Sequence, residues 1–139
     1  MIEPTLAFQT AIRAALIAAP AVVALVPADQ IRAGSSRPDK LPAIMMAGAQ
    51  TQFLGSAAGA QYVARVVMDL HIWAIEDGAF AAQAIGLAIL NVLKDAPASA
   101  DMTIDEWQKP AVRWMRDPDP ELAYTHGVLT VECVMRWQV

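Results

Sequence analysis

The hydrophobic and polar positions of this 139-residue chain follow two different periods, which predict helices and strands in turn. Apolar residues recur at helical spacing over 5–19, and we expect this helix to end or kink at Pro20. A second helix is expected over 78–94, with Asp77 as its cap. Both helices have only a thin polar strip, which favours burial on more than one side and hence an assembly of several subunits.

Alternation of apolar and polar residues predicts the strands of a sheet. We expect strands over 31–33, 41–48, 61–75, 107–116 and 123–137. In the clearest of them, 61–75, one face is apolar and the other carries Arg65, Asp69 and His71 among apolar side chains. The sheet should therefore have one buried face and one mixed face.

The order of these elements predicts an α+β fold. Strands joined by hairpins, with helices between them, give an antiparallel, mixed-face sheet of four to five strands with two main helices packed on one face. The length suits a single domain over 1–139. Between the strands, 49–61 holds Gly55, Ser56 and Gly59 among small residues, and we expect it to be a flexible loop with a functional role.

Composition and charge limit the classes of partner. Hydrophobic residues make up 56% of the chain, above the roughly 45–50% of ordinary soluble domains, and much of the excess is alanine. The net charge of -4 gives no basic surface for gripping nucleic acid. The apolar stretch 6–26 contains Arg13 and Pro20, which disfavour a membrane span. We expect a soluble protein of the cytoplasm with no membrane partner.

Few residues offer catalytic or metal chemistry. His71, His126 and Cys133 are too widely spaced for a zinc site, and we expect hydrogen-bonded histidines on the mixed face and a buried cysteine. A small enzyme or ligand-binding domain that uses both histidines is the alternative, and it requires them to converge in a pocket with a shifted pKa.

The loop of the last hairpin carries alternating carboxylates. Asp117, Asp119 and Glu121 could be calcium ligands, but prolines stand where a calcium loop needs glycine and further oxygen ligands, so we expect solvated turn residues. No phosphate-binding glycine loop or nucleophile motif occurs in the sequence. The sequence thus predicts neither catalytic residues nor a metal nor another cofactor.

The closing hairpin, 113–137, carries the most distinctive signature. Its loop reads Arg-Asp-x-Asp at 116–119, and its return strand opens Thr-His-Gly-Val-Leu at 125–129. This arrangement resembles the tail terminator (tail completion) proteins of long-tailed, non-contractile phages, prophages and gene transfer agents. Three further pieces resemble that family in the same order along nearly the whole chain: a proline-led strand at 41–48, a central strand at 67–73 and an alanine-rich helix at 78–93. Pro120 and Ala43 depart from it, where the family often has a glycine and an aromatic residue.

The resemblance implies a structural assembly protein and not an enzyme. Such a protein caps the growing tail tube, ends its polymerisation and forms a ring, usually a hexamer, at the head-tail joint. The implied partners are further copies of the chain, the tail tube protein and the head connector or stopper protein, while DNA passes through the lumen without specific binding. The implied location is the tail-neck junction of a virion or phage-like particle assembled in the bacterial cytoplasm.

Two segments are the expected assembly interfaces: the glycine-containing segment before the central strand, and the closing hairpin loop with its return strand. The expected contact residues are Gln50, Gln52, Phe53, Leu54, Arg116, Asp117, Asp119, Glu121, Tyr124 and His126. Another neck protein, such as a head completion or connector subunit, remains the nearest alternative function.

Overall fold

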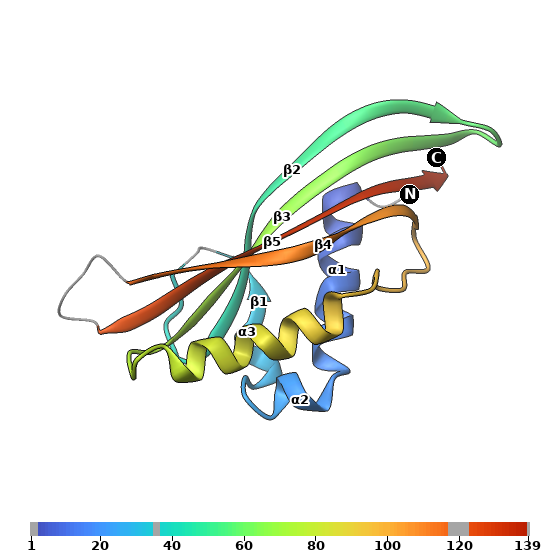
Figure 1. Ribbon diagram of the computed structural model, residues 1–139. Helices are drawn as coiled ribbons and strands as arrows, with labels where there is room; N and C mark the ends of the chain where they lie inside the picture. Colours follow the sequence, from blue (N-terminus) through green and yellow to red (C-terminus); the bar gives the residue numbers. More distant parts are fainter. Residues whose placement is uncertain (1–2, 35–36, 117–122, 139) are drawn as a thin grey trace.

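The structure, a computed structural model, describes residues 3–34, 37–116 and 123–138. Its order of helices and strands confirms the expected α+β class (Figure 1). The elements are α1 (Pro4–Ile17), α2 (Pro20–Val23), the 3-10 turn η1 (Ala28–Gln30), β1 (Ile31–Ala33), β2 (Ala43–Ala57), β3 (Gln61–Ile75), α3 (Phe80–Leu93), β4 (Thr103–Arg116) and β5 (Tyr124–Gln138).

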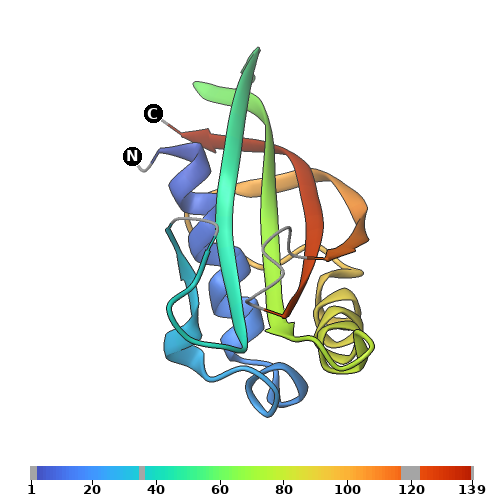
Figure 2. The same ribbon diagram turned by 90° about the vertical axis from the view of Figure 1, so that its left-hand side faces the viewer.

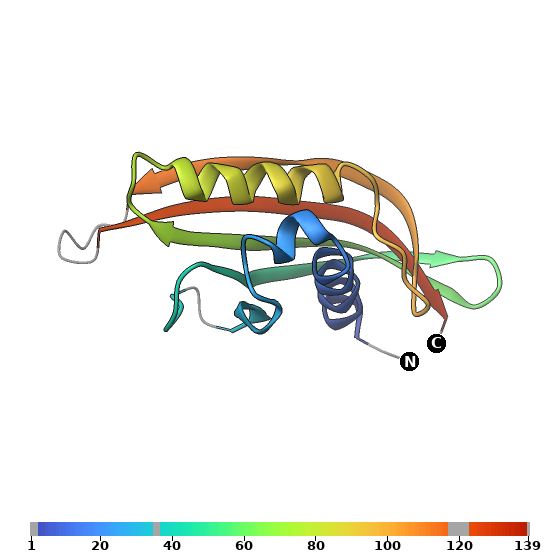
Figure 3. The same cartoon turned by 90° about the horizontal axis from the view of Figure 1, so that it is seen from below.

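The strands form one sheet in the order β1-β2-β3-β5-β4. The four long strands pair antiparallel, as expected, whereas β1 pairs parallel with β2 and makes the sheet mixed at that edge. Both α1 and α3 lie on the same face of the sheet (Figures 2 and 3). The molecule therefore has two layers, and the core lies between the helices and one face of the sheet.

Side-chain hydrogen bonds fix the start of the first helix and tie the helix to the sheet. The carboxylate of Glu3 accepts from two backbone N–H groups of the first turn, both at 3.0 Å. The helix ends at Ile17, slightly earlier than expected, and Pro20 opens the short helix α2, because a proline at the first helical position loses no hydrogen bond. Arg13 Nε donates to the Ile31 carbonyl at 2.7 Å and ties α1 to β1.

The alternation predicted for the central strand is confirmed. One face of β3 lies under the helices, and its buried members are Ala64, Val66, Met68, Leu70 and Ile72. The other face carries the half-buried Arg65, Asp69 and His71. The same period continues on β5, where Cys133 is buried as expected. The sheet thus has one apolar face and one mixed face.

The prediction of a flexible loop over 49–61 is wrong. These residues form the outer half of β2, a tight turn and the start of β3, and β2 pairs with β3 along its whole length. Register shifts lie beside Gly48 and Gly55, which have φ of 65° and 134°. Glycine inside a strand commonly marks a bulge that bends it. We call residues 49–62 the arm, which extends beyond the helices as a curved hairpin (Figures 1 and 3).

The start of α3 differs from the expected one. Asp77 is not its cap: Ala79 stands at the cap position with φ of 66° and without a capping side chain. Asp77 still contributes, because its Oδ1 accepts from the Ala81 N–H at 3.3 Å. The left-handed backbone at Ala79 turns the chain back sharply after β3, so that α3 runs back along the strands of the sheet (Figure 3).

Tryptophans on β4 attach α3 to the closing hairpin. The Trp114 indole lies between Gly86 of α3 and Gly127 of β5, where a Cβ on either glycine would approach the ring to less than 3.0 Å. Trp107 Nε1 donates to the carbonyl of Leu93 at 2.9 Å, at the last residue of the helix. These tryptophans therefore pack between the helix and the closing hairpin.

The strand β4 begins at Thr103, four residues before the expected start. The added residues 103–106 are mostly polar, and Asp105 Oδ2 accepts from Arg136 Nε of β5 at 2.7 Å. The pairing continues to Arg116 at the other end. The two closing strands thus make a long hairpin, as the sequence predicted.

Candidate functional site

The expected interface residues fall at opposite ends of the sheet. The arm turns at the end where Gln61 pairs with Gln138, and Tyr124 pairs with Ile75 at the other end. The 15 residues of β3 separate these ends by roughly 46 Å, at about 3.3 Å per residue. The expected contacts therefore form two surfaces. Asp117, Asp119 and Glu121 lie outside the described residues, and their role stays a prediction.

The arm carries the first surface. Its Gln50, Gln52, Phe53 and Leu54 are all exposed, and Phe53 keeps 60% of its surface accessible. The sequence has no charged residue between Lys40 and Arg65. An exposed and uncharged hairpin with large apolar side chains is typical of a contact surface, because unpaired strand edges and apolar patches are otherwise kept small or charged.

Aromatic rings connect the arm to the body of the protein. The Phe53 ring meets Tyr62 edge-on at 5.5 Å between centroids, and Tyr62 lies 5.9 Å from the buried Trp137. At the base of the arm, Thr5 Oγ1 of α1 and Thr51 Oγ1 are 2.6 Å apart in a hydrogen bond. These contacts hold the arm in a defined position relative to the core.

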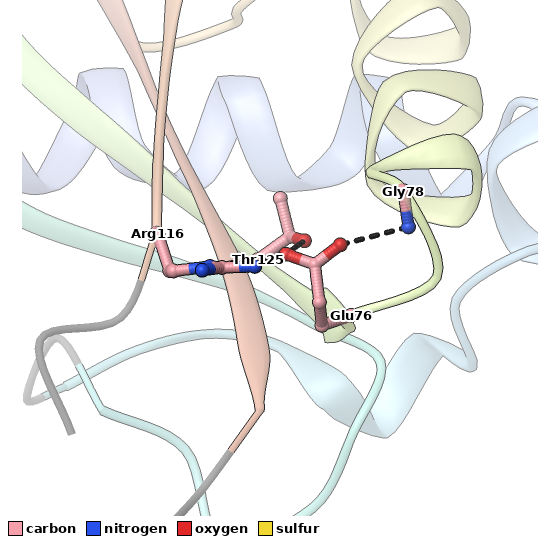
Figure 4. Close-up of polar contacts among 4 residues, drawn as sticks. All are labelled: Glu76, Gly78, Arg116 and Thr125. Carbon is pink, nitrogen blue, oxygen red and sulfur yellow. Dashed lines mark hydrogen bonds and ion pairs between the residues drawn. The ribbon is translucent and has the colours of Figure 1, made fainter. Parts of the chain in front are cut away.

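Glu76 organises the second surface, at the end of β3 (Figure 4). Its Oε1 accepts from the Gly78 N–H at 2.7 Å, and its Oε2 accepts from Thr125 Oγ1 at 3.0 Å. Arg116 Nε lies 3.9 Å from the same Oε2. One carboxylate thus joins the end of β3, the turn before α3, and both closing strands. Sequence reasoning missed this residue, although an acidic residue directly before Asp-Gly in a strand-to-helix turn was a usable signal.

These hydrogen bonds lower the pKa of the Glu76 carboxyl. The Gly78 N–H and the Thr125 hydroxyl, with a smaller contribution from the Arg116 charge, hold the pKa of Glu76 below its usual value. Glu76 therefore stays ionised at neutral pH. Arg116 itself is 81% exposed and contributes only this distant ion pair among the described residues, so its guanidinium remains accessible to a partner.

The two histidines meet on the mixed face of the sheet. His71 Nδ1 and His126 Nε2 are 2.8 Å apart in a hydrogen bond. The His126 ring also stacks on Trp73, with 3.9 Å between centroids and 8° between planes. Burial lowers the pKa of His71, while the nearby Asp69 charge opposes that shift. The expectation of hydrogen-bonded histidines is confirmed, and this convergence also meets one requirement of the enzyme alternative.

The described residues offer little further chemistry. Among residues 3–34, 37–116 and 123–138, no three His, Cys, Asp or Glu side chains gather closely enough to hold a metal ion. Burial raises the pKa of the Cys133 thiol to about 12, so this cysteine is not a nucleophile at neutral pH. Within the same ranges, every helix is too short or too polar to cross a membrane. The exposed features suit contacts between proteins better than catalysis.

An apolar groove lies beside the Glu76 junction, and sequence reasoning missed it as well. It has a volume of about 610 Å³ and no charged residue in its lining. Phe80, at the start of α3, is 79% exposed at its edge, and Ile75 and Leu25 are exposed with it. The only signal in the sequence was the thin polar strip of the second helix. The groove makes the second surface strongly apolar.

Comparison with known proteins agrees with this architecture. No curated protein matches the chain significantly. Among solved structures, a chain of the structure described as "Virion of native gene transfer agent (GTA) particle" has a TM-score of 0.66 and 15% sequence identity, over 97% of this chain and 99% of that chain. At such a low sequence identity, this likeness shows a similar fold and nothing about function. Residues 10–136 match the family described as "Tail completion protein gp17". The expected resemblance is thereby confirmed: this chain belongs to the tail completion protein gp17 family, whose members are structural proteins of phage tails.

Proposed function

We propose that this protein caps the phage-like tail tube, ends its polymerisation and forms a ring at the head-tail joint. Membership in the tail completion family over residues 10–136 is the observation that carries this proposal. The two exposed surfaces at opposite ends of the sheet support it, because each subunit of a closed ring must offer two different patches to its neighbours. The proposal assigns no catalytic role to the protein.

The proposed ring is a hexamer placed between two other components of the particle. One side contacts the last ring of the tail tube protein, and the other side receives the head connector or stopper protein. DNA passes through the lumen without specific binding. The net charge of -4 suits this passage, because a protein without a strong positive field does not hold the phosphate backbone.

A head completion or connector subunit is the nearest alternative, since it would occupy the same neck. The two functions differ in the protein that is contacted first. A cap binds the end of the tail tube before the head arrives, whereas a connector subunit binds the portal side of a head without a tail. Pull-down of the tail tube protein from cells that make no heads therefore separates the two proposals.

Charge reversal in the closing loop tests the proposed interface. We expect Arg116→Glu combined with Asp119→Arg to reduce the yield of joined particles in a strain that lacks the natural gene. Arg116 is 81% exposed, so the monomer should keep its fold. The measurement counts complete particles by electron microscopy and compares the circular dichroism of the purified proteins.

A matched control is available elsewhere on the surface. Arg32 and Asp39 form another exposed ion pair at 3.9 Å, outside the expected interface. Arg32→Glu combined with Asp39→Arg should leave the particle yield unchanged. Equal yields from both double variants and the natural protein would show that the closing loop makes no assembly contact.

A further inference from the structure

The molecule carries two uncharged apolar features of opposite shape. One is the arm, which projects from the body, and the other is the groove of about 610 Å³ beside α3. The arm exposes Phe53 and Leu54, and the groove exposes Ile75 and Phe80. Large exposed apolar side chains on a soluble protein commonly mark a surface that is covered in the assembled state.

Both features lack charged residues, and the groove is large enough to receive side chains of the arm. The segment between Lys40 and Arg65 contains no charged residue, and none lines the groove. Burying either feature against the other would thus leave no ion without a partner. The groove volume also lies within the roughly 300–1,000 Å³ of pockets that enclose a drug-sized ligand. A small number of apolar side chains, such as Phe53 and Leu54 of the arm, would fit into it.

Geometry decides which molecule can supply the arm. Within one chain, Phe53 pairs with Ala64 near the start of β3, whereas Ala74 and Ile75 at the end of β3 line the groove. The arm of a given copy therefore cannot fold back into its own groove without breaking the sheet. A projection at one end and a complementary hollow at the other end give a head-to-tail contact, the type that closes into a ring.

We propose that the arm of one copy docks against the apolar groove of the next copy, with Phe53 and Leu54 of its β2 strand as the inserted side chains. This inference rests on the proposed ring and names the surfaces that build it. Such a contact forms the same interface at every junction of the ring. The groove wall then consists of Leu25, Leu41, Ile75, Phe80, Ala84 and Tyr124 of the receiving copy.

Disulfide cross-linking inside assembled particles tests this contact. Leu54→Cys combined with Ala84→Cys places one thiol on the exposed β2 strand of the arm and one in the groove. The natural Cys133 is buried and does not compete. Particles that carry this double variant should, after mild oxidation, give a ladder of covalent multimers on a non-reducing gel. Each single variant should remain monomeric, because every cross-link needs both positions.

Leu87 supplies the matched control on the same helix. It is 61% exposed but lies outside the groove, so Leu54→Cys combined with Leu87→Cys should give no ladder. Normal particles with monomeric protein, or equal ladders from both double variants, would overturn the docking of arm into groove and leave the capping function standing. Particles that contain none of this protein would overturn the capping function itself.

A second pair of variants covers the case in which the cysteine proteins do not assemble. Phe53→Ser combined with Leu54→Ser removes two large apolar side chains from exposed positions of the arm and should leave the monomer folded. Losing two apolar anchors should lower the yield of complete particles by at least about tenfold. Leu87→Ser should not lower it. Equal yields from these two variants would contradict the proposed contact.

Discussion

Gly127 and His126 are adjacent residues of the closing strand, and each has a distinct structural role. His126 stacks on Trp73 and bonds to His71 on the mixed face of the sheet. Gly127 faces the other way and leaves room for the indole of Trp114, which also touches Gly86 of α3. The His-Gly pair of the sequence signature thus serves two different layers of the protein, and its glycine is required by packing.

Substitution of Gly127 tests this packing at the scale of one methyl group. Gly127→Ala should reduce the free energy of unfolding by about 1–3 kcal/mol, because the new Cβ would overlap the Trp114 ring and force it to move. Urea denaturation of the purified protein measures the change. In a Trp114→Phe background the smaller ring leaves space, so the same substitution should cost less. An equal cost in both backgrounds would contradict the proposed clash.

The pKa of His71 predicts a loss of stability in acid. Burial lowers this pKa from 6.5, so the unfolded chain takes up a proton at a higher pH than the folded protein does. Stability should therefore fall as the pH drops below about 6.5 toward the folded-state pKa. Thermal unfolding across this interval should show a steeper pH dependence for the natural protein than for His71→Gln. Equal slopes would show that His71 does not titrate differently in the two states.

Among the elements, helices and strands with a clear period were predictable, and those interrupted by glycine were not. The alternation of β3 identified its buried face, because a half-buried strand needs an apolar residue at every second position. Gly55, Ser56 and Gly59 interrupted the same signal in β2 and the turn after it and suggested a loop. Gly55, like Gly48 at the end of the expected strand, instead has a positive φ at a bulge of a paired strand. Local sequence cannot distinguish these outcomes, since the pairing depends on a strand further along the chain.

The candidate contact surfaces were predictable only in part. Exposed arm residues such as Phe53 could be identified, because the segment was expected to make contacts whether it formed a loop or a strand. The groove and the distant partner of Glu76, Thr125, could not, since both involve elements that are far apart in sequence. The histidine pair lay between these cases. Alternation could place His71 and His126 on the mixed face, but only the strand register brings their rings together.

At the scale of the whole molecule, the fold is a long sheet with a different surface at each end. The arm projects beyond the helices at one end (Figure 1), and the groove lies at the other end. A head-to-tail arrangement of copies in a ring uses both ends. Such an arrangement suits a member of the tail completion family, because closure into a ring gives an assembly of fixed size.

Electron microscopy of particles from a strain that lacks this gene tests the capping function most directly. Without a cap, tube polymerisation has no defined end and heads have no ring to join. We therefore expect tails of uncontrolled length, or finished tails without heads, and recovery when the natural gene is returned. Tails of normal length joined normally to heads would contradict the proposed function.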